Sequence, residues 1–536
     1  MSEKKKPETF IRTSSGLVRS FSPFLAFVFS SAILTYGSGI DVGVSWCAFL
    51  YSDANLAIAL TISMIFGLFF GVLYALFMVA MPRSGGDYIW TSRVLHPAIG
   101  FVMNFVFTIW MWIWAGTECS ILTVFHLSPA LAMFGTAFRD PTLMSWSAML
   151  LNPVPQYIVA LILLFLCVVV ISLGGKYLNN FLKVTWAIGM VGVGILLAIM
   201  AFATPQQFAA GFDNAFGIAG VTSYNSVISS AKDIGFSFLP LTLWGSIVAA
   251  PFGFFMYFGY HCTAYISGEI RDVKLSAPLS IVGVLVSAWV IESIAALLYY
   301  NVVGVEFNQA ASFLYYMHPD KWVLPTSPMY WYFASLLTDN AFVQCFLGIS
   351  LISWMLVMEP CILIVCVRNL FAWSFDRVLP TKLAKVSDKY STPLYLSVIV
   401  TIGAAISLYV YLFTPYLVLT MNNTLAWCLA LIIPGIAGAL FPYIKKDFYE
   451  KSAIAKYKVG SVPMITIFGV LTAATFLFEA WAALAIPGVG GPTGAPALIA
   501  IVITFILPFI IYYGSRAYHR SRGIDIELAF KEIPPS

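Results

Sequence analysis

Long apolar runs separated by short polar stretches recur along the whole chain. They are apolar on every side of a helix, whereas the strands of a membrane barrel alternate apolar and polar residues. Each run reaches the roughly 20 residues that a helix needs to cross the hydrocarbon core of a bilayer. The pattern therefore predicts an all-α polytopic membrane protein without an inserted soluble domain. Twelve spans are expected, at 24–50, 56–81, 98–125, 156–174, 180–204, 241–268, 279–304, 340–367, 394–414, 417–442, 462–486 and 496–514.

Two of these runs are interrupted near their middle. The first contains "YGSGI" (Tyr36 to Ile40), and the sixth contains "PFGFFMYFGYHC" (Pro251 to Cys262). Paired Gly/Pro-broken spans at matching places in two halves indicate an inverted-repeat transporter with a binding site near the midplane. With five helices in each half, helix 6 runs opposite to helix 1, as inversion requires. The expected parts are an N-terminal tail (1–22), helices 1–5 (23–204), helices 6–10 (205–442), helices 11–12 (443–514) and a C-terminal tail (515–536).

Composition and charge support a membrane location and give an orientation. Hydrophobic residues make up 60% of the 536 residues and charged residues only 10%, with a mean hydropathy of +0.89. If the N-terminus is cytoplasmic, all but three of the 28 Lys and Arg residues lie on the cytoplasmic side, as the positive-inside rule requires. The exceptions are Arg139, Lys232 and Lys321. We therefore expect both termini in the cytoplasm, a place in the plasma membrane, and no nucleic-acid partner despite the net charge of +4.

A helix broken inside the membrane implies a cavity, because irregular backbone is tolerated there only where it faces protein or water. A break at Gly37-Ser38-Gly39 would leave free amides at the start of the outer half-helix and free carbonyls at the end of the inner one. Free amides suit a carboxylate, and free carbonyls suit an ammonium group. The two ends of an amino acid match these groups. The alternative is that the small residues form a close-packed helix interface.

The chain resembles the amino acid-polyamine-organocation transporter superfamily. Four stretches carry the resemblance: "YGSGI", "PRSGGDYIWTSRVLHPAIGF" (Pro82 to Phe101), "FFMYFGYHCTAYISGEIRD" (Phe254 to Asp272) and "VRNLFAWSFDRVLPTKLAKVSDKYSTP" (Val367 to Pro393). The resemblance implies the five-plus-five inverted-repeat fold with discontinuous helices 1 and 6, followed by two further helices. It also implies a secondary transporter that moves amino acids by alternating access, with a polyamine or cationic amino acid exchanger of the same fold as the alternative.

The resemblance also implies a substrate site. The backbone of Ser38 and Gly39 would hold the substrate carboxylate, carbonyls near Thr35 and around 255–258 would hold its amine, and Phe255 would form an aromatic lid. The alternative for the aromatic residues is ordinary core packing. The expected substrate-binding residues are Thr35, Gly37, Ser38, Gly39, Ile40, Phe255, Tyr257, Phe258 and Gly259.

Four residues are candidates for coupling or a proton path: Asp41, Lys183, His261 and Glu269. Asp41 would cap the outer half-helix or bind a cationic part of the substrate. His261 lies where many relatives have a glutamate. It would act either as a proton relay or as a packing residue. Glu269 would pair with Arg93 or Arg271.

Some proton-driven relatives have a lysine in helix 5 beside helix 1, which makes Lys183 the candidate for that role. Lys183 could instead reach the cytoplasmic interface, and an alignment anchored on Asn179-Asn180 places Trp186 at the expected position. Protons are the expected coupling ion and sodium is the alternative, with no cofactor and no protein-bound metal. Ser350 and Ser353 could ligate sodium, or they could bond to their own helix.

Further polar residues within the spans are candidates for function because buried ionisable groups are costly in a membrane. The acids are Glu118, Glu292, Glu359 and Glu479, and the candidates for side-chain selectivity are Asn104, Asn422 and Asn423. Two other classes of protein fit less well. An intramembrane aspartyl protease needs a second matching aspartate motif, and a channel needs a filter-like loop or a ring of charge. Neither is present in the sequence.

Overall fold

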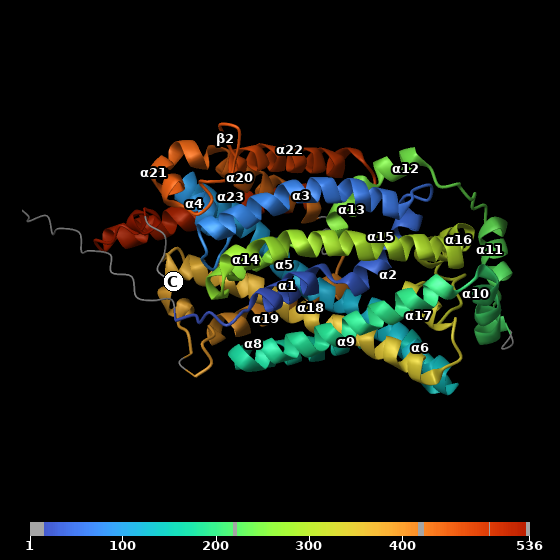
Figure 1. Ribbon diagram of the computed structural model, residues 1–536. Coiled ribbons are helices and arrows are strands. Elements are labelled where there is room, and N and C mark those ends of the chain that lie inside the picture. Colours follow the sequence, from blue (N-terminus) through green and yellow to red (C-terminus); the bar gives the residue numbers. More distant parts are fainter. Residues whose placement is uncertain (1–15, 218–221, 388, 416–422, 492–493, 532–536) are drawn as a thin grey trace, which may run out of the picture.

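The long helices run roughly parallel in one elongated bundle, and short helices gather at its two ends (Figure 1). The computed structural model describes residues 16–217, 222–387, 389–415, 423–491 and 494–531. Three short helices lie at one end of the bundle: α4 (Asp87–Val94), α14 (Val273–Pro278) and α21 (Lys446–Lys451). At the other end, α10 (Pro205–Phe212) and α11 (Tyr224–Asp233) run across the bundle.

Within the described residues, eleven helical stretches are long and apolar enough to cross a membrane. Three of them combine several elements: α1 (Pro23–Leu34) with α2 (Tyr36–Leu50); α5 (Pro97–Leu122) with η1 (Thr123–Leu127) and α6 (Ser128–Phe138); and α14 with η4 (Leu279–Gly283) and α15 (Val284–Val302). The others are α3 (Leu56–Ala80), α8 (Pro153–Leu173), α9 (Gly175–Phe202), α18 (Ala341–Phe375), α19 (Leu394–Phe413), α20 (Asn423–Ile444), α22 (Met464–Ala485) and α23 (Ala495–Ser521).

The remaining elements are short. The helices are α7 (Pro141–Met149), η2 (Asp213–Gly217), α12 (Leu243–Val248), α13 (Ala250–Met256), η3 (Cys262–Glu269), α16 (Val305–Met317), α17 (Tyr330–Ser335), η5 (Thr381–Ala384) and η7 (Ile526–Phe530). Two strands, β1 (Lys458–Val459) and β2 (Val462–Pro463), pair antiparallel before α22.

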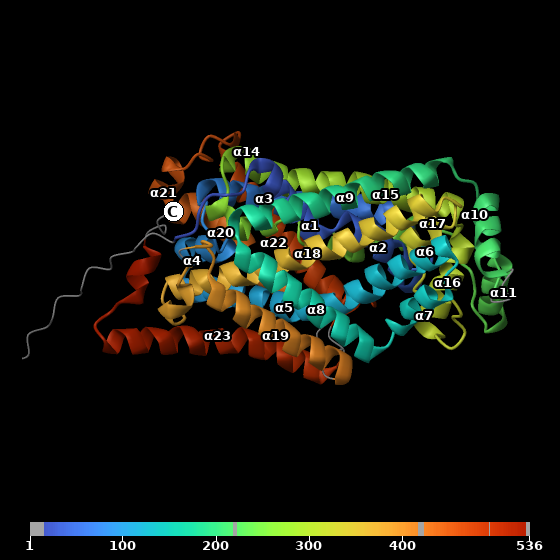
Figure 2. The same ribbon diagram turned by 90° about the horizontal axis from the view of Figure 1, so that it is seen from below.

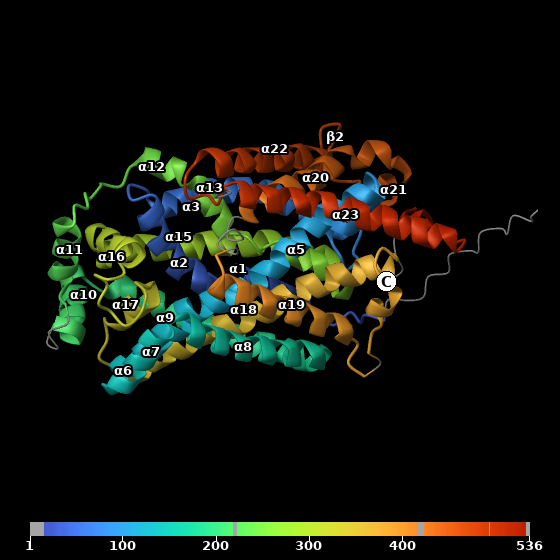
Figure 3. The same cartoon turned by 180° about the vertical axis from the view of Figure 1, so that it is seen from behind.

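Outer helices carry apolar side chains away from the protein, as expected for contact with lipid. α23 lies on the outside of the bundle (Figures 2 and 3), and Ile506 and Ile510 are more than half exposed there. By contrast, α1 and α18 lie side by side in the centre (Figure 2). The core at the centre therefore surrounds the first broken helix.

The first long helix is interrupted at one residue. Thr35 ends α1 and precedes α2, with φ 49° and ψ 94°. A β-branched residue seldom adopts positive φ, so this backbone is strained. The interruption lies two residues before the Gly37-Ser38-Gly39 break that the sequence predicted, and both of these glycines lie inside α2.

The predicted sixth span is divided into three short elements, so it is not among the eleven long helices. α12 ends at Val248, α13 follows it and ends at Met256, and η3 begins at Cys262. The intervening segment, 257–261, forms turns, and Gly259 in it has φ 109°. The second interruption thus lies where the aromatic-rich stretch predicted it and is longer than the first.

Candidate functional site

A cavity of about 140 Å³ lies at the two interruptions. The first broken helix, α5 and the segment around Met256 supply most of its wall. Two threonines, one glutamate, the backbone of a glycine and the indoles of two tryptophans provide the polar groups, and the other lining residues are apolar. The lining residues with polar groups are Thr35, Gly39, Trp46, Trp114, Thr117 and Glu118.

At the first interruption, the end of α1 and the start of α2 carry opposite partial charges, and both face this region. The amide of Gly39 donates to the carbonyl of Thr35 at 2.9 Å, so Gly39 is the first residue of α2 whose amide is used by the helix. The amides of residues 36–38 precede the first helical hydrogen bond, and the last carbonyls of α1 likewise lie beyond its ladder. The amides available for a carboxylate therefore begin two residues before the expected pair, at residue 36; the amide of Ser38 is among them and that of Gly39 is not.

The two interruptions touch each other through Gly259. A Cβ atom at this position would lie 2.6 Å from Cγ2 of Ile33 and 3.1 Å from the backbone nitrogen of Leu34. Both close contacts lie in the last turn of α1, next to Thr35. Glycine is therefore required here both for its positive φ and for its small size. This contact places the helix 6 segment against the end of α1.

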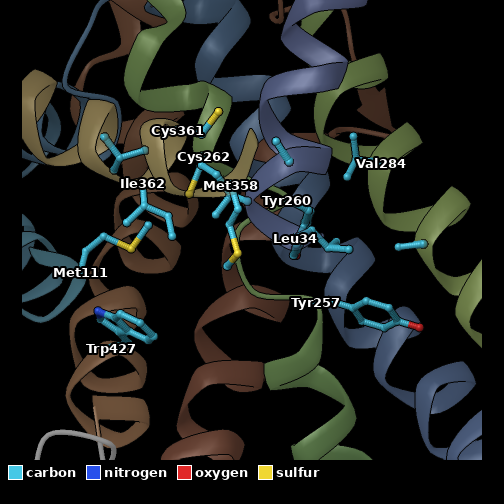
Figure 4. Close-up of a cluster of buried hydrophobic side chains, with 14 of the residues drawn as sticks. Leu34, Met111, Tyr257, Tyr260, Cys262, Val284, Met358, Cys361, Ile362 and Trp427 are labelled. Atoms are coloured by element: carbon cyan, nitrogen blue, oxygen red, sulfur yellow. The ribbon is translucent and has the colours of Figure 1, made fainter. Parts of the chain in front are cut away.

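Stacked aromatic rings form one side of the site. Phe258 stacks on Trp427 of α20, with ring centroids 4.1 Å apart and planes 6° from parallel. Phe255 stacks on the same tryptophan at 6.4 Å, and Trp114 meets it edge-on at 6.0 Å. Figure 4 shows Trp427 below Met358, which also lines the cavity. Phe255, Phe258 and Trp114 are lining residues as well.

The predicted substrate residues separate into two groups. Thr35, Gly39, Phe255 and Phe258 line the cavity, whereas Gly37, Ile40, Tyr257 and Gly259 are not among its lining residues. The hydroxyl of Tyr257 donates to the carbonyl of Leu60 and points away from Met358 (Figure 4).

Gly37 has a packing role, which is the alternative that small residues in a membrane helix suggest. A Cβ atom there would collide with the indole of Trp354, and the Gly37 carbonyl accepts from the indole N–H of Trp331 at 3.1 Å. Ser38 lies in the first turn of α2, and its side chain is outside the described part of the structure.

Asp41 caps a different helix from the one expected. It is fully buried in the second turn of α2, and its Oδ1 accepts from the backbone amide of Trp331 at 2.9 Å. Trp331 lies at the start of α17. The expectation that Asp41 caps its own half-helix is therefore wrong, because the interruption at Thr35 places Asp41 beyond the free amides.

Lys183 lies on an exposed face of α9. Trp186 of α9 reaches α1, where its indole N–H donates to the Ser31 hydroxyl at 2.8 Å. The alignment anchored on Asn179-Asn180 anticipated this arrangement.

His261 is packed among aromatic rings. It is fully buried, and its ring lies 4.8 Å from Phe70, 5.3 Å from Phe258 and 5.3 Å from Tyr74 between centroids. Within the described part of the chain, neither ring nitrogen has a hydrogen-bond partner. These contacts match a packing residue.

Glu269 forms an ion pair, but its partner is neither Arg93 nor Arg271, so the predicted partners are wrong. Arg368 of α18 donates to both carboxylate oxygens, at 2.6 and 2.8 Å. Arg93 pairs instead with Asp376 at 2.7 Å. The sequence did not indicate these pairs because each joins residues about 100 to 280 positions apart.

The carboxylate of Glu292 contacts α2 at Gly39, although Glu292 does not line the cavity. A Cβ atom on Gly39 would collide with Oε1 of Glu292, which comes from α15. Glu292 is 2% exposed, and neither carboxylate oxygen has a hydrogen-bond partner in the described residues. The phenols of Tyr36 and Tyr257 are its titratable neighbours. The sequence indicated Glu292 as a candidate because it is an acid within an apolar span.

The remaining polar candidates are bonded elsewhere. Asn104 donates to Asp87 and accepts from the indole N–H of Trp373. Ser350 and Ser353 each donate to a carbonyl one turn earlier in α18, as the alternative to sodium binding predicted. Asn422 and the side chain of Asn423 lie outside the described residues.

Comparison with known proteins adds one finding. A family model described as amino acid permease matches residues 20–507. A search of curated proteins found no match.

Proposed function

Because the chain belongs to the amino acid permease family, we propose that it is a proton-coupled secondary transporter that moves amino acids by alternating access. The observation that supports this proposal is the cavity that adjoins both interrupted helices. Family membership and the eleven apolar helices place the protein in a membrane as a transporter.

In the proposed site, the start of α2 and the end of α1 receive the two ends of an amino acid. The amides of residues 36–38 would bind the carboxylate, and the last carbonyls of α1 would bind the ammonium group. Charge at a helix end contributes about 0.3–1 kcal/mol at exposed sites and up to ~2 kcal/mol in partly buried ones. Phe255 and Phe258 would cover the bound substrate.

We propose that α12, α13 and η3 together form a twelfth crossing. The chain would then consist of two inverted groups of five helices, followed by α22 and α23, and both termini would lie in the cytoplasm at the plasma membrane. A four-helix group containing both interruptions would rock against the rest. The hinge positions would be Thr35 and Gly259, whose backbones have positive φ.

Glu292 and Lys183 are the two candidates for the proton-binding group. Glu292 is supported by its contact with Gly39, one turn past the first interruption, and by its lack of a hydrogen-bond partner in the described residues. An ionised carboxylate buried in this way is costly, and a proton would remove that cost. Lys183 is supported only by the family resemblance, because its side chain is exposed.

Uptake into proteoliposomes tests the proposed function. Purified protein is reconstituted, and accumulation of radiolabelled amino acids is measured with and without an inward proton gradient. We expect saturable uptake that a proton gradient raises and a protonophore abolishes. Uptake that does not depend on the gradient would contradict proton coupling. The absence of uptake for all amino acids and amines would contradict the transporter assignment itself.

A further inference from the structure

Glu118 is the charged residue that lines the cavity. It comes from α5, on the wall that also contains Trp114 and Thr117. Glu118 is buried, with a residue exposure of 5%. A ligand would therefore reach its carboxylate through the cavity. No other lining residue carries a charge.

No cationic side chain neutralises Glu118 within the described part of the chain. The ion pairs found there involve other acids, namely Asp376, Glu269, Glu450 and Glu527. The indole of Trp114, one turn earlier, is within hydrogen-bonding reach, and the phenol of Tyr411 is close enough for electrostatic interaction. One neutral donor satisfies only part of a carboxylate, which accepts about four hydrogen bonds.

A second buried carboxylate increases the negative charge at this wall. Glu359 of α18 lies close enough to Glu118 for electrostatic interaction and has the thiol of Cys119 as a neighbour, but its two oxygens lack hydrogen-bond partners in the described residues. Two neighbouring carboxylates in apolar surroundings repel each other unless a cation or a proton joins them. The cavity next to Glu118 gives a cation a place to bind.

The aromatic wall suits an organic cation in particular. Trp114 lies edge-on to Trp427 and to Phe258, 6.0 and 6.4 Å away between centroids. Ring faces attract ammonium and guanidinium groups, and they also contact aliphatic carbons. A carboxylate and aromatic rings beside an apolar cavity therefore match a cation at the end of an aliphatic chain.

We propose that Glu118 binds the side-chain ammonium or guanidinium group of a cationic amino acid. This inference rests on the proposed function, because the helix interruptions would hold the carboxylate and α-amino group of the same ligand. A neutral amino acid would leave the Glu118 carboxylate without a cation in an apolar cavity. Selectivity would therefore come from the carboxylate of α5.

Three matched ligands test each part of the proposal on purified wild-type protein. Norleucine is lysine without the terminal ammonium group, and cadaverine is lysine without the carboxylate. Binding is measured by thermal shift and by competition with radiolabelled lysine. We expect lysine to bind about 10-fold to 100-fold more tightly than norleucine, since a hydrogen bond to a charged group contributes about 1.5–3 kcal/mol. Arginine and its neutral analogue citrulline form a second matched pair.

The Glu118→Gln variant tests the residue. It keeps the size of the side chain and removes its charge, so lysine affinity should fall about 10-fold to 100-fold while norleucine affinity stays the same or rises. Glu479→Gln is the matched control, because Glu479 is also a buried glutamate in a span and does not line the cavity. If Glu118→Gln does not fold, the comparison of lysine with norleucine on the wild-type protein decides the question.

Each outcome separates this inference from the proposed function. Equal binding of lysine and norleucine by the wild-type protein would overturn the role of Glu118 and leave an amino acid transporter. The same lysine preference in Glu118→Gln would also overturn it. If cadaverine binds as tightly as lysine, the result would support the cation site and contradict the carboxylate site at α2. If none of the twenty amino acids binds, the proposed function fails too.

Discussion

Buried carboxylates at one end of the bundle have side-chain partners, whereas two glutamates beside the interruptions have no hydrogen-bond partner in the described residues. At the end that contains α4 and α14, Arg368 binds both oxygens of Glu269. In the same region Asp87 accepts from the hydroxyls of Tyr74 and Tyr265, at 2.6 and 2.7 Å, and from Asn104 at 2.8 Å. Beside the interruptions, Glu292 and Glu359 have no hydrogen-bond partner in the described residues.

This difference separates two uses of a buried charge. A paired carboxylate joins elements that are distant in the chain: Glu269 and Arg368 connect η3 to α18. An unpaired carboxylate stabilises nothing by itself, and a protein retains it where a ligand or a proton completes it. The following substitutions test this distinction, in order of their expected effect on the free energy of unfolding.

Arg368→Met should have the largest effect. It leaves Glu269 buried without its partner, and breaking a buried ion pair costs about 3–5 kcal/mol. The loss is measured as a lower thermal midpoint and a lower yield of monodisperse protein in detergent. Adding Glu269→Gln to this variant should recover much of the loss. A single variant as stable as the wild type would contradict a structural role for the pair.

Asp87 should make stability depend on pH. Burial raises the pKa of this carboxyl from 3.8 to about 6, against hydrogen bonds from Tyr74, Tyr265 and Asn104 that lower it. An acid with a raised pKa takes up a proton on folding. Its contribution is therefore complete below pH 4 and is lost as the pH rises through about 6, a change of ~3 kcal/mol.

Thermal melting of the wild type and of Asp87→Asn between pH 4 and 8 measures this change. The wild-type midpoint should fall relative to that of the variant as the pH rises from 4 to 7. Other titrating groups are common to both proteins and cancel in the difference. Parallel curves across this range would show that Asp87 does not titrate there.

Gly39→Ala should have a smaller cost, about 1–3 kcal/mol, which is typical of overpacking. Its new methyl group would collide with the Glu292 carboxylate, and substrate uptake should also fall because Gly39 lines the cavity. The double variant Gly39→Ala/Glu292→Ala removes the collision and should regain stability. Equal destabilisation of the single and double variants would show that the strain arises elsewhere.

Glu292→Gln should change the free energy of unfolding least, by less than about 1 kcal/mol, because no partner is lost. Uptake driven by a proton gradient should nevertheless disappear, while exchange of internal for external substrate continues. Lys183→Met is the comparison variant: if Glu292 carries the proton, this variant retains gradient-driven uptake. If Glu292→Gln retains gradient-driven uptake and Lys183→Met loses it, coupling would be assigned to Lys183.

Much of the fold could be predicted from the sequence because the bilayer imposes a length and an all-round apolar character on every crossing. The aromatic-rich second interruption was also visible, as glycine and proline in an apolar run. The position of the first interruption was not predicted correctly, because Thr35 has a backbone that local preference would not select. Trp331, Trp354 and Gly259, all distant in the sequence, pack against the residues on either side of it.

From the order of its residues alone, this chain could be recognised as a multi-pass membrane protein with two interrupted apolar runs and several acids within apolar spans. Those properties follow from local composition. The tertiary structure alone decided which acids are paired, because Glu269 and Arg368, or Arg93 and Asp376, meet only when distant helices pack together. The same packing placed Glu118 at the cavity and Lys183 on an exposed face. Electrostatic pairing depends on distances in space, which the order of residues along a chain does not specify.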